Sequence, residues 1–382
     1  MNNNKSKTTT LLLEKNKAQS AEFIKPANKS SRQYHRAKHP TEIAAFKCMD
    51  GRLNLPVITN VPQGIIQPYR QIAGVFDLGD PYLGSLIEGW VDYSISKARK
   101  CLVLSTYHFS KGDHHRGCAG HQENTKQALE WAKRLVNQHK LVFGEVTPSS
   151  IVFPVVVGIE TDTDGLIFHG YSGKTFAVFD NLDLSAEEIS DRITEIYPEM
   201  PTDVRNDLMI LVSGNCDHVK KTKKEERDLL ELVHGESIIC IGRGFGWLHE
   251  PNKALIIGPY ENELFSLEDA IETAGNIVLK NIKEGRVSKT DGVTVMCSSL
   301  FLEEGMNRMR ETVKAFTLFK VAKKVLSEKV PELADCNLQF LVGSTNQDDW
   351  LFREIDPNSF NEYFESNIGL SDEELKIIES SK

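Results

Sequence analysis

Two cysteines and one histidine, drawn from separate stretches of the chain, are side chains that bind zinc. Cys48 opens the sequence Cys-Met-Asp-Gly-Arg, and His108 and Cys118 follow 60 and 70 residues later. Two thiolates and one imidazole leave the fourth position of a tetrahedral zinc ion open, whereas a structural site normally fills that position with a protein ligand. The pattern therefore predicts a catalytic zinc site held by Cys48, His108 and Cys118.

Two more polar residues, Asp50 and Arg52, lie in the segment that leaves Cys48. Zinc bound to two thiolates has its charge nearly cancelled, so neighbouring groups must help to activate its solvent. We expect Arg52 to hold the Asp50 carboxylate off the metal in a bidentate pair, while Asp50 accepts a hydrogen bond from that solvent and orients it. Asp50 and Arg52 are therefore the candidate catalytic residues.

Short apolar runs that end near these residues predict the strands that position them. Residues 43–46 form a run that ends near Cys48, and residues 101–104 form a run that ends near His108. Between the runs, Asp80 and a following proline mark the start of a helix with apolar residues at helical spacing. Strand, helix and strand predict a right-handed parallel crossover, with Cys48 and His108 at the carboxyl ends of parallel strands.

Later segments continue the α/β pattern. Asn124 caps an expected helix, residues 155–159 form a third buried strand, and a polar turn leads from it to a further strand at 166–168. Ser185 and Glu188 form a capping box for the next helix. The charged stretch 220–227 reads as the solvated face of a helix that continues through Leu229, Leu230 and Leu232.

Length, composition and charge indicate a globular protein and exclude several other classes. A chain of 382 residues with 40% apolar residues can bury a substantial core. No apolar run approaches the length of a membrane span, and the start lacks a signal sequence, so we expect a cytoplasmic protein. Seven cysteines without disulfide-like spacing fit a reducing compartment, and a net charge of −9 argues against nucleic-acid binding.

Residues 1–40 differ from the rest of the chain. They carry nine lysines and arginines against two glutamates and few apolar residues. Such a segment buries too little apolar surface to offset its ordering entropy, so we expect a disordered basic tail. The tail either docks on an acidic partner or keeps the protein soluble.

The second half of the chain resembles a degenerate copy of the first. Residues 237–243 correspond to the run into Cys48 and Arg52, residues 293–297 to the run into His108, and residues 340–352 to the third strand and its turn. No histidine lies near Cys297, so the copy cannot hold zinc. We therefore expect a zinc-bearing catalytic domain at 41–235 and a degenerate domain at 236–382.

The motif Cys-x-Asp-x-Arg, followed by a histidine and a cysteine, resembles the β-class carbonic anhydrases. The stretches 106–110, 115–121 and 158–164 are more closely similar to the carboxysome shell carbonic anhydrase family, a divergent β-class. The resemblance covers about residues 41–370. It implies an α/β fold with a mainly parallel sheet flanked by helices, internally duplicated with a degenerate second half.

The resemblance leaves one ligand open. The common β-class spacing His-x-x-Cys is met by His115 and Cys118, yet the family's imidazole sits at the end of the second parallel strand, where His108 lies. We prefer His108 as the ligand and keep His115 as the alternative. His114, His115 and His121 either relay protons or are ordinary surface histidines.

The resemblance implies a lyase that uses Zn²⁺ to hydrate carbon dioxide reversibly to bicarbonate. It also implies carbon dioxide fixation in a bacterial microcompartment, the carboxysome, with Rubisco or shell proteins as partners through the N-terminal tail and a dimer or higher homo-oligomer. Two alternatives remain: a carbon disulfide or carbonyl sulfide hydrolase on the same scaffold, and a non-catalytic assembly protein.

Three other features have simpler interpretations. Cys216 and His218 have too few neighbouring ligands for a second metal. The glycine-rich segment 242–246 lacks a phosphate-binding fingerprint and matches the Asp50–Arg52 segment of the first half. Asp162 and Asp164 fit a turn between two strands better than a calcium site.

Overall fold

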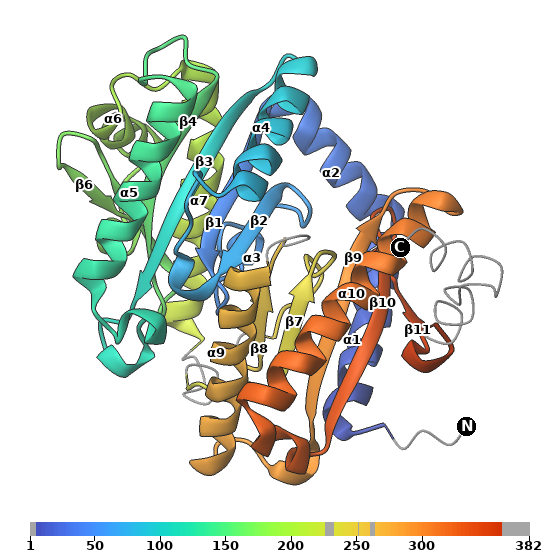
Figure 1. Ribbon diagram of the computed structural model, residues 1–382. Helices are drawn as coiled ribbons and strands as arrows, with labels where there is room; N and C mark the ends of the chain where they lie inside the picture. Colours follow the sequence, from blue (N-terminus) through green and yellow to red (C-terminus); the bar gives the residue numbers. More distant parts are fainter. Residues whose placement is uncertain (1–4, 226–232, 251, 260–263, 361–382) are drawn as a thin grey trace, which may run out of the picture.

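The structure, a computed structural model, describes residues 5–225, 233–250, 252–259 and 264–360. It contains two mixed, mainly parallel sheets, each flanked by helices (Figure 1). This is the expected α/β class. None of the described helices has the length and apolar character needed to cross a membrane.

The first sheet has the strand order β2-β1-β3-β4-β5-β6. Strands β1, β2, β3 and β4 are parallel, and β5 and β6 continue the sheet in antiparallel fashion. The strands are β1 (Thr41–Cys48), β2 (Ile66–Gln71), β3 (Lys100–Phe109), β4 (Val152–Glu160), β5 (Gly165–His169) and β6 (Thr175–Ala177). The helices of this half are α3 (Leu55–Ile58), α4 (Pro81–Ser96), α5 (Thr125–Phe143), α6 (Ala186–Ile196) and α7 (Thr202–Lys224), with short 3-10 turns at 72–74, 114–116, 119–121 and 178–180.

Both faces of β1 are buried, which explains its unbroken apolar run. Ala44 and Phe46 pack with α4, whereas Ile43 and Ala45 belong to the core on the α7 side. A strand buried on both faces is typical of a parallel sheet between helices. The predicted crossover β1–α4–β3 is confirmed, and it brings Cys48 and His108 to the same edge of the sheet.

The helix starts predicted from capping residues are also confirmed. Asp80 accepts from two backbone N–H groups at the start of α4, Asn124 caps α5, and Ser185 with Glu188 forms the capping box of α6. The sequence reading missed β2, because Pro68 suggested a loop. A proline is tolerated here since β2 is the edge strand, where a missing N–H breaks no ladder. Part of the predicted helix 220–232 lies outside the described residues.

The second sheet repeats the order and the directions of the first five strands. Its order is β11-β10-β9-β7-β8, with only β11 antiparallel. The strands are β7 (Ile238–Gly242), β8 (Ala254–Ile257), β9 (Val293–Phe301), β10 (Leu338–Asn346) and β11 (Phe352–Ile355). The helices are α9 (Leu264–Lys283) and α10 (Met306–Lys329), with 3-10 turns at 289–291 and 331–336. That the two halves arose by duplication of one unit stays a prediction. The domain boundaries at 41–235 and 236–382 also stay predictions.

The expectation of a disordered N-terminal tail is wrong for the described part. Helices α1 (Lys7–Phe23) and α2 (Pro26–Lys38) precede β1, and α1 packs against the second sheet (Figure 1). The buried face of α1 consists of Leu12 and small polar residues. Thr9 hydrogen-bonds Thr294, and Asn16 donates to the Trp350 carbonyl. Hydrogen bonds therefore supply much of the stabilisation of α1 that its few apolar residues cannot provide.

The two sheets meet at their edge strands β2 and β8. The Arg70 N–H donates to the Gly258 carbonyl at 2.7 Å, and the Gly258 N–H donates back to Arg70 at 2.9 Å. The segment that leaves β1 also contacts β8, because the Gly51 N–H donates to the Ala254 carbonyl at 3.0 Å. The second half of the chain therefore borders the predicted catalytic segment.

Candidate metal centre and catalytic pair

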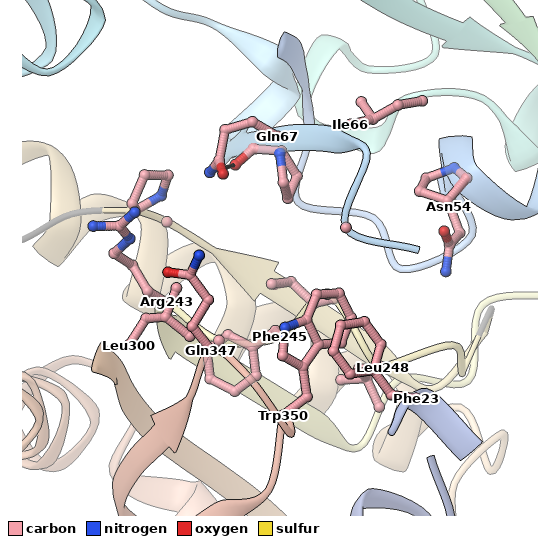
Figure 2. A pocket seen from close by; sticks show the side chains of 18 of the residues that line it. Phe23, Asn54, Ile66, Gln67, Arg243, Phe245, Leu248, Leu300, Gln347 and Trp350 are labelled. Carbon is pink, nitrogen blue, oxygen red and sulfur yellow. Dashed lines mark hydrogen bonds between the residues drawn. The ribbon is translucent and has the colours of Figure 1, made fainter. Parts of the chain in front are cut away.

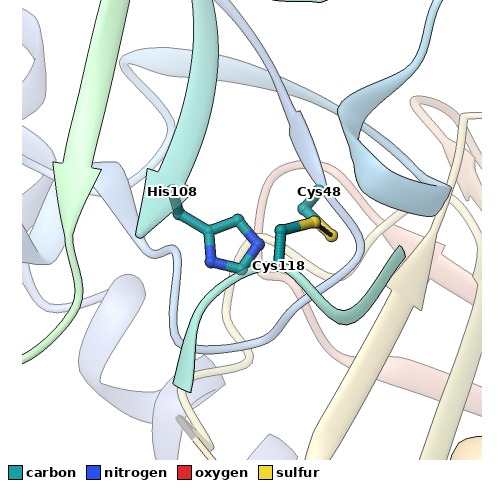
Figure 3. A group of neighbouring side chains, drawn as sticks. All are labelled: Cys48, His108 and Cys118. Atoms are coloured by element: carbon teal, nitrogen blue, oxygen red, sulfur yellow. Dashed lines mark hydrogen bonds between the residues drawn. The ribbon is translucent and has the colours of Figure 1, made fainter. Parts of the chain in front are cut away.

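Cys48, His108 and Cys118 come together in one buried group (Figure 3). Cys48 ends β1, His108 lies near the end of β3, and Cys118 follows in the loop between β3 and α5. Their donor atoms all lie within 4.8 Å of one another. The three predicted ligands, separated by up to 70 residues in the chain, thus converge at the carboxyl edge of the parallel strands.

The geometry of the group fits zinc. The sulfur atoms of Cys48 and Cys118 are 4.0 Å apart, and two sulfurs each about 2.3 Å from a tetrahedral ion would lie roughly 3.8 Å apart. His108 is 2% exposed, and neither of its ring nitrogens has a hydrogen-bond partner in the structure. A buried imidazole normally satisfies at least one nitrogen. A metal ligand role accounts for this exception.

The two thiols influence each other's protonation. The hydrogen bond from Cys118 lowers the pKa of Cys48 well below its ordinary value, and the same bond raises the pKa of Cys118. One of the two sulfurs is therefore ready to be a thiolate. A cation placed between them would favour the thiolate form of both.

Asp50 and Arg52 form the expected buried pair. Arg52 Nε donates to both carboxylate oxygens at 3.1 Å, and Arg52 Nη2 donates to Oδ2 at 2.6 Å. Burial alone would raise the pKa of Asp50, but the charge and hydrogen bonds of Arg52 hold it well below the ordinary value. Asp50 is therefore an ionised carboxylate, which can only accept hydrogen bonds.

The sequence analysis missed two residues of the segment that precedes β7, His234 and Glu236, which lie beside this pair. His234 Nε2 lies 3.3 Å from Arg52 Nη2, and His234 Nδ1 lies 2.7 Å from an oxygen of Glu236. Glu236 is buried and also accepts from Asn281 at 2.8 Å. The only signal in the sequence was a glutamate directly before a buried strand. These residues extend the network around Arg52 across the junction of the sheets.

The alternative histidines lie elsewhere. His114 and His115 are exposed in a 3-10 turn and, with Asp113, form a separate group of donor atoms. His121 is buried, and its Nε2 lies 3.0 Å from the Ala73 carbonyl oxygen. The structure therefore brings His108, and not His115, to the two cysteines. Within the described residues, these two groups are the ones with three or more close metal-ligand side chains.

The remaining candidates have structural partners. Asp162 accepts hydrogen bonds from Ser110 and Arg116, and so holds the loop that leads to Cys118. Asp164 accepts from His218 at 2.9 Å if that ring nitrogen is protonated. Cys216 is buried beside them without forming a metal group. The turn interpretation of the two aspartates fits these contacts.

Two cavities flank the site. One, of about 510 Å³, lies between α1, α2 and the two sheets; Figure 2 shows Ile66 and Gln67 of β2 on one side and Arg243 of the second half on the other. Its charged lining is mostly basic. The charged residues are Lys29, Arg32, Arg36, Lys47, Arg70, Arg243 and Asp348. The other cavity, of about 450 Å³, is lined by Ala73, Gly120 and His121, and Ala73 packs in the same core as the two cysteines.

Comparison with known protein families gives a match to part of the chain. Residues 34–199 match the family model described as the Carboxysome Shell Carbonic Anhydrase, catalytic domain, which confirms the resemblance indicated by the sequence. The matched range contains all five predicted site residues and ends before α7 and the second sheet. No curated protein matches the chain.

Proposed function

We propose that the chain hydrates carbon dioxide reversibly to bicarbonate, because residues 34–199 match the catalytic domain of the carboxysome shell carbonic anhydrase family. The metal is Zn²⁺, with Cys48, His108 and Cys118 as its ligands. The observation that carries the proposal is the buried, unpartnered His108 beside two sulfurs 4.0 Å apart. This donor set leaves one tetrahedral position for solvent.

A zinc ion bound there supplies a Lewis acid that lets water lose a proton near neutral pH. The protein residues supply the rest. Asp50, held ionised by Arg52, accepts a hydrogen bond from the attacking water and fixes the direction of its lone pair. Arg52, by donating to both carboxylate oxygens, would keep Asp50 from becoming a metal ligand itself. The Arg52 guanidinium is itself fixed by the Arg116 carbonyl at 3.0 Å and by His234.

The substrate is small and apolar, so it needs an apolar route and no charged recognition group. The cavity beside Ala73 and Gly120 offers such a route next to the core that contains both cysteines. We propose that carbon dioxide enters and bicarbonate leaves there. Asp77, Asp80 and Asp269 also line this cavity.

The family's name refers to the carboxysome shell, and we propose the same location for this chain. There it would supply carbon dioxide to Rubisco, as a dimer or a larger homo-oligomer. Among the described residues of the N-terminal segment, we propose the outer face of α2, where Lys29, Arg36 and Lys38 are exposed, as the surface for such a partner.

A substrate comparison on the zinc-loaded, full-length protein tests the reaction. Stopped-flow hydration of carbon dioxide is measured beside sulfide release from carbonyl sulfide and carbon disulfide, with Asp50→Asn as the matched control. We expect hydration that is much slower in the control. Sulfide release alone would assign the scaffold to a hydrolase. No turnover with any substrate would indicate an assembly protein, although a retained Asp50–Arg52 pair argues against that outcome.

A further inference from the structure

The second half of the chain reaches the catalytic pair through its backbone. The Gly51 N–H donates to the Ala254 carbonyl at 3.0 Å, and the Ile256 N–H donates to the Met49 carbonyl at 2.8 Å. These two hydrogen bonds lie on either side of Asp50. The backbone around Asp50 is therefore fixed by β8, a strand outside the matched family region.

Gly51, between Asp50 and Arg52, has no space for a side chain. A Cβ atom at this position would lie 2.4 Å from the Ala254 carbonyl oxygen and 3.2 Å from that of Glu250. Both are backbone atoms and cannot turn aside as a flexible side chain would. A glycine is thus what allows β8 to approach the catalytic segment so closely.

Arg70 of β2 forms a second link between the halves. Its backbone pairs with Gly258 in both directions. Its guanidinium donates to the Asp50 carbonyl at 2.9 Å and to the Leu53 carbonyl at 3.2 Å. One residue therefore ties the edge of the second sheet to both ends of the turn that contains Asp50 and Arg52.

The environment of Arg70 is unusual for a structural arginine. Its side chain is buried, and among the residues that the structure describes no carboxylate forms an ion pair with it. Burial lowers the pKa of Arg70 to about 10. Burying a cation without a directly paired carboxylate is unfavourable, and the more distant charge of Asp50 and the hydrogen bonds to carbonyls offset only part of that cost. An apolar side chain in this space would avoid the cost of burying a charge. The hydrogen bonds that orient the Asp50–Arg52 turn therefore explain why an arginine occupies this position.

We infer that Arg70 is a positioning residue for carbon dioxide hydration, acting by holding the Asp50–Arg52 turn against β8. The inference rests on the proposed function. The hydrogen bonds of Arg70 go to backbone carbonyls, so it acts through Asp50 and not on the reacting atoms. The second sheet, which lacks the zinc ligands, thereby becomes part of the catalytic apparatus.

A double-mutant cycle in the full-length, zinc-loaded protein tests this role, with kcat, KM and bound zinc measured for each variant. We expect Arg70→Gln to keep its zinc and lower kcat about tenfold or more with KM little changed, since misplacement by about 1 Å can cost far more. In an Asp50→Ala background, the same change should alter the residual kcat less than about twofold, because Arg70 acts through Asp50.

Three further variants separate positioning from general stability. Arg70→Lys keeps the charge and can reach one carbonyl, so it should recover part of the activity. Gly51→Ala should resemble Arg70→Gln, whereas Gly89→Ala, at an exposed helix position with open space, should not. Arg32→Gln removes another buried guanidinium from the same cavity, one that donates to the Phe23 carbonyl, and should leave kcat unchanged.

Two results would overturn the inference. One is an equal loss of kcat from Arg70→Gln with and without Asp50, which would show that Arg70 acts elsewhere. The other is loss of zinc or of the folded state in both Arg70→Gln and Arg70→Lys, which would make Arg70 a general structural residue. Failure of the proposed function is distinct, since the zinc-loaded wild type itself would then show no hydration.

Discussion

The Arg52 Nη2 atom lies 2.6 Å from Asp50 Oδ2, and the two side chains are only 4% and 5% exposed. This buried ion pair follows directly on Cys48 and faces the second half of the chain. Because Arg52 donates hydrogen bonds to both carboxylate oxygens, Asp50 stays ionised. The pair thus connects the candidate metal centre with the junction of the two sheets.

Replacing Arg52 with methionine should destabilise the fold and stop turnover. Asp50 would remain buried without its counter-charge, which costs about 3–5 kcal/mol of unfolding free energy for a pair of this kind. Urea unfolding at neutral pH measures the change, and stopped-flow hydration should show a loss of about 100-fold or more in kcat. Arg192→Met, which breaks an exposed pair with Glu195, is the control and should cost less than about 1 kcal/mol. Unchanged stability of Arg52→Met would contradict the account.

The two rival histidines predict opposite metal contents. His108→Gln should lose zinc, because it removes one of three convergent donors, and Cys118→Ser should do the same. His115→Gln is the matched control and should keep about one zinc per chain, since His115 is exposed and outside the group. Elemental analysis of the purified proteins decides between them. Zinc retained by His108→Gln and lost by His115→Gln would reverse the ligand assignment.

Buried His139 should make the folded protein sensitive to acid. Burial lowers the pKa of His139 from its ordinary value to about 4. A depressed histidine pKa means that stability is full above about pH 6.5 and is lost as the pH falls towards the folded value. Between about pH 6.5 and 4, wild-type unfolding free energy should therefore fall more steeply than that of His139→Leu. Urea unfolding across this range measures both slopes, with exposed His114→Gln as the control. Parallel curves for wild type and His139→Leu would be inconsistent with a depressed pKa.

Asn16 should be essential for seating α1 on the second sheet. Its side chain donates to the Trp350 carbonyl at 2.9 Å and accepts from the Phe352 N–H at 2.9 Å, and it is almost fully buried. Asn16→Ala leaves both backbone groups without a partner, at a cost of about 1–3 kcal/mol each in unfolding free energy. Asn28→Ala, at a half-buried position of α2 where the side chain donates to the Glu22 carbonyl, is the control. Equal stabilities of the two variants would show that α1 contributes little to the fold.

The sequence predicts the parts of the site that depend on neighbouring residues, such as an apolar run or two polar residues in one turn. Cys48 and His108 could be placed because each follows an apolar run, and parallel strands bring their carboxyl ends together. Asp50 and Arg52 could be assigned roles because they are two residues apart in one turn. The choice between His108 and His115 needed the structure, since it depends on where the loop after β3 folds.

The missed features depend on contacts between distant segments. Arg70 lies in the edge strand β2, which the sequence does not predict because Pro68 suggests a loop. Its role in positioning the Asp50–Arg52 turn also depends on pairing with the second sheet. His234 approaches Arg52 from a segment 182 residues away along the chain, which no spacing rule reveals. The basic, polar composition of residues 1–40 predicts disorder, whereas α1 is held by contacts with distant segments: Leu12 packs in the core of the second sheet, and Thr9 and Asn16 hydrogen-bond to β9 and to the segment around Trp350.

X-ray absorption at the zinc edge of the full-length protein tests the central claim most directly. The account predicts a four-atom shell with two sulfurs at about 2.3 Å and two nitrogen or oxygen atoms at about 2.0–2.1 Å, one from His108 and one from solvent. Asp50→Asn should leave this shell unchanged. A shell with three or four sulfurs, or with none, would contradict a site held by Cys48, His108 and Cys118 with one position open.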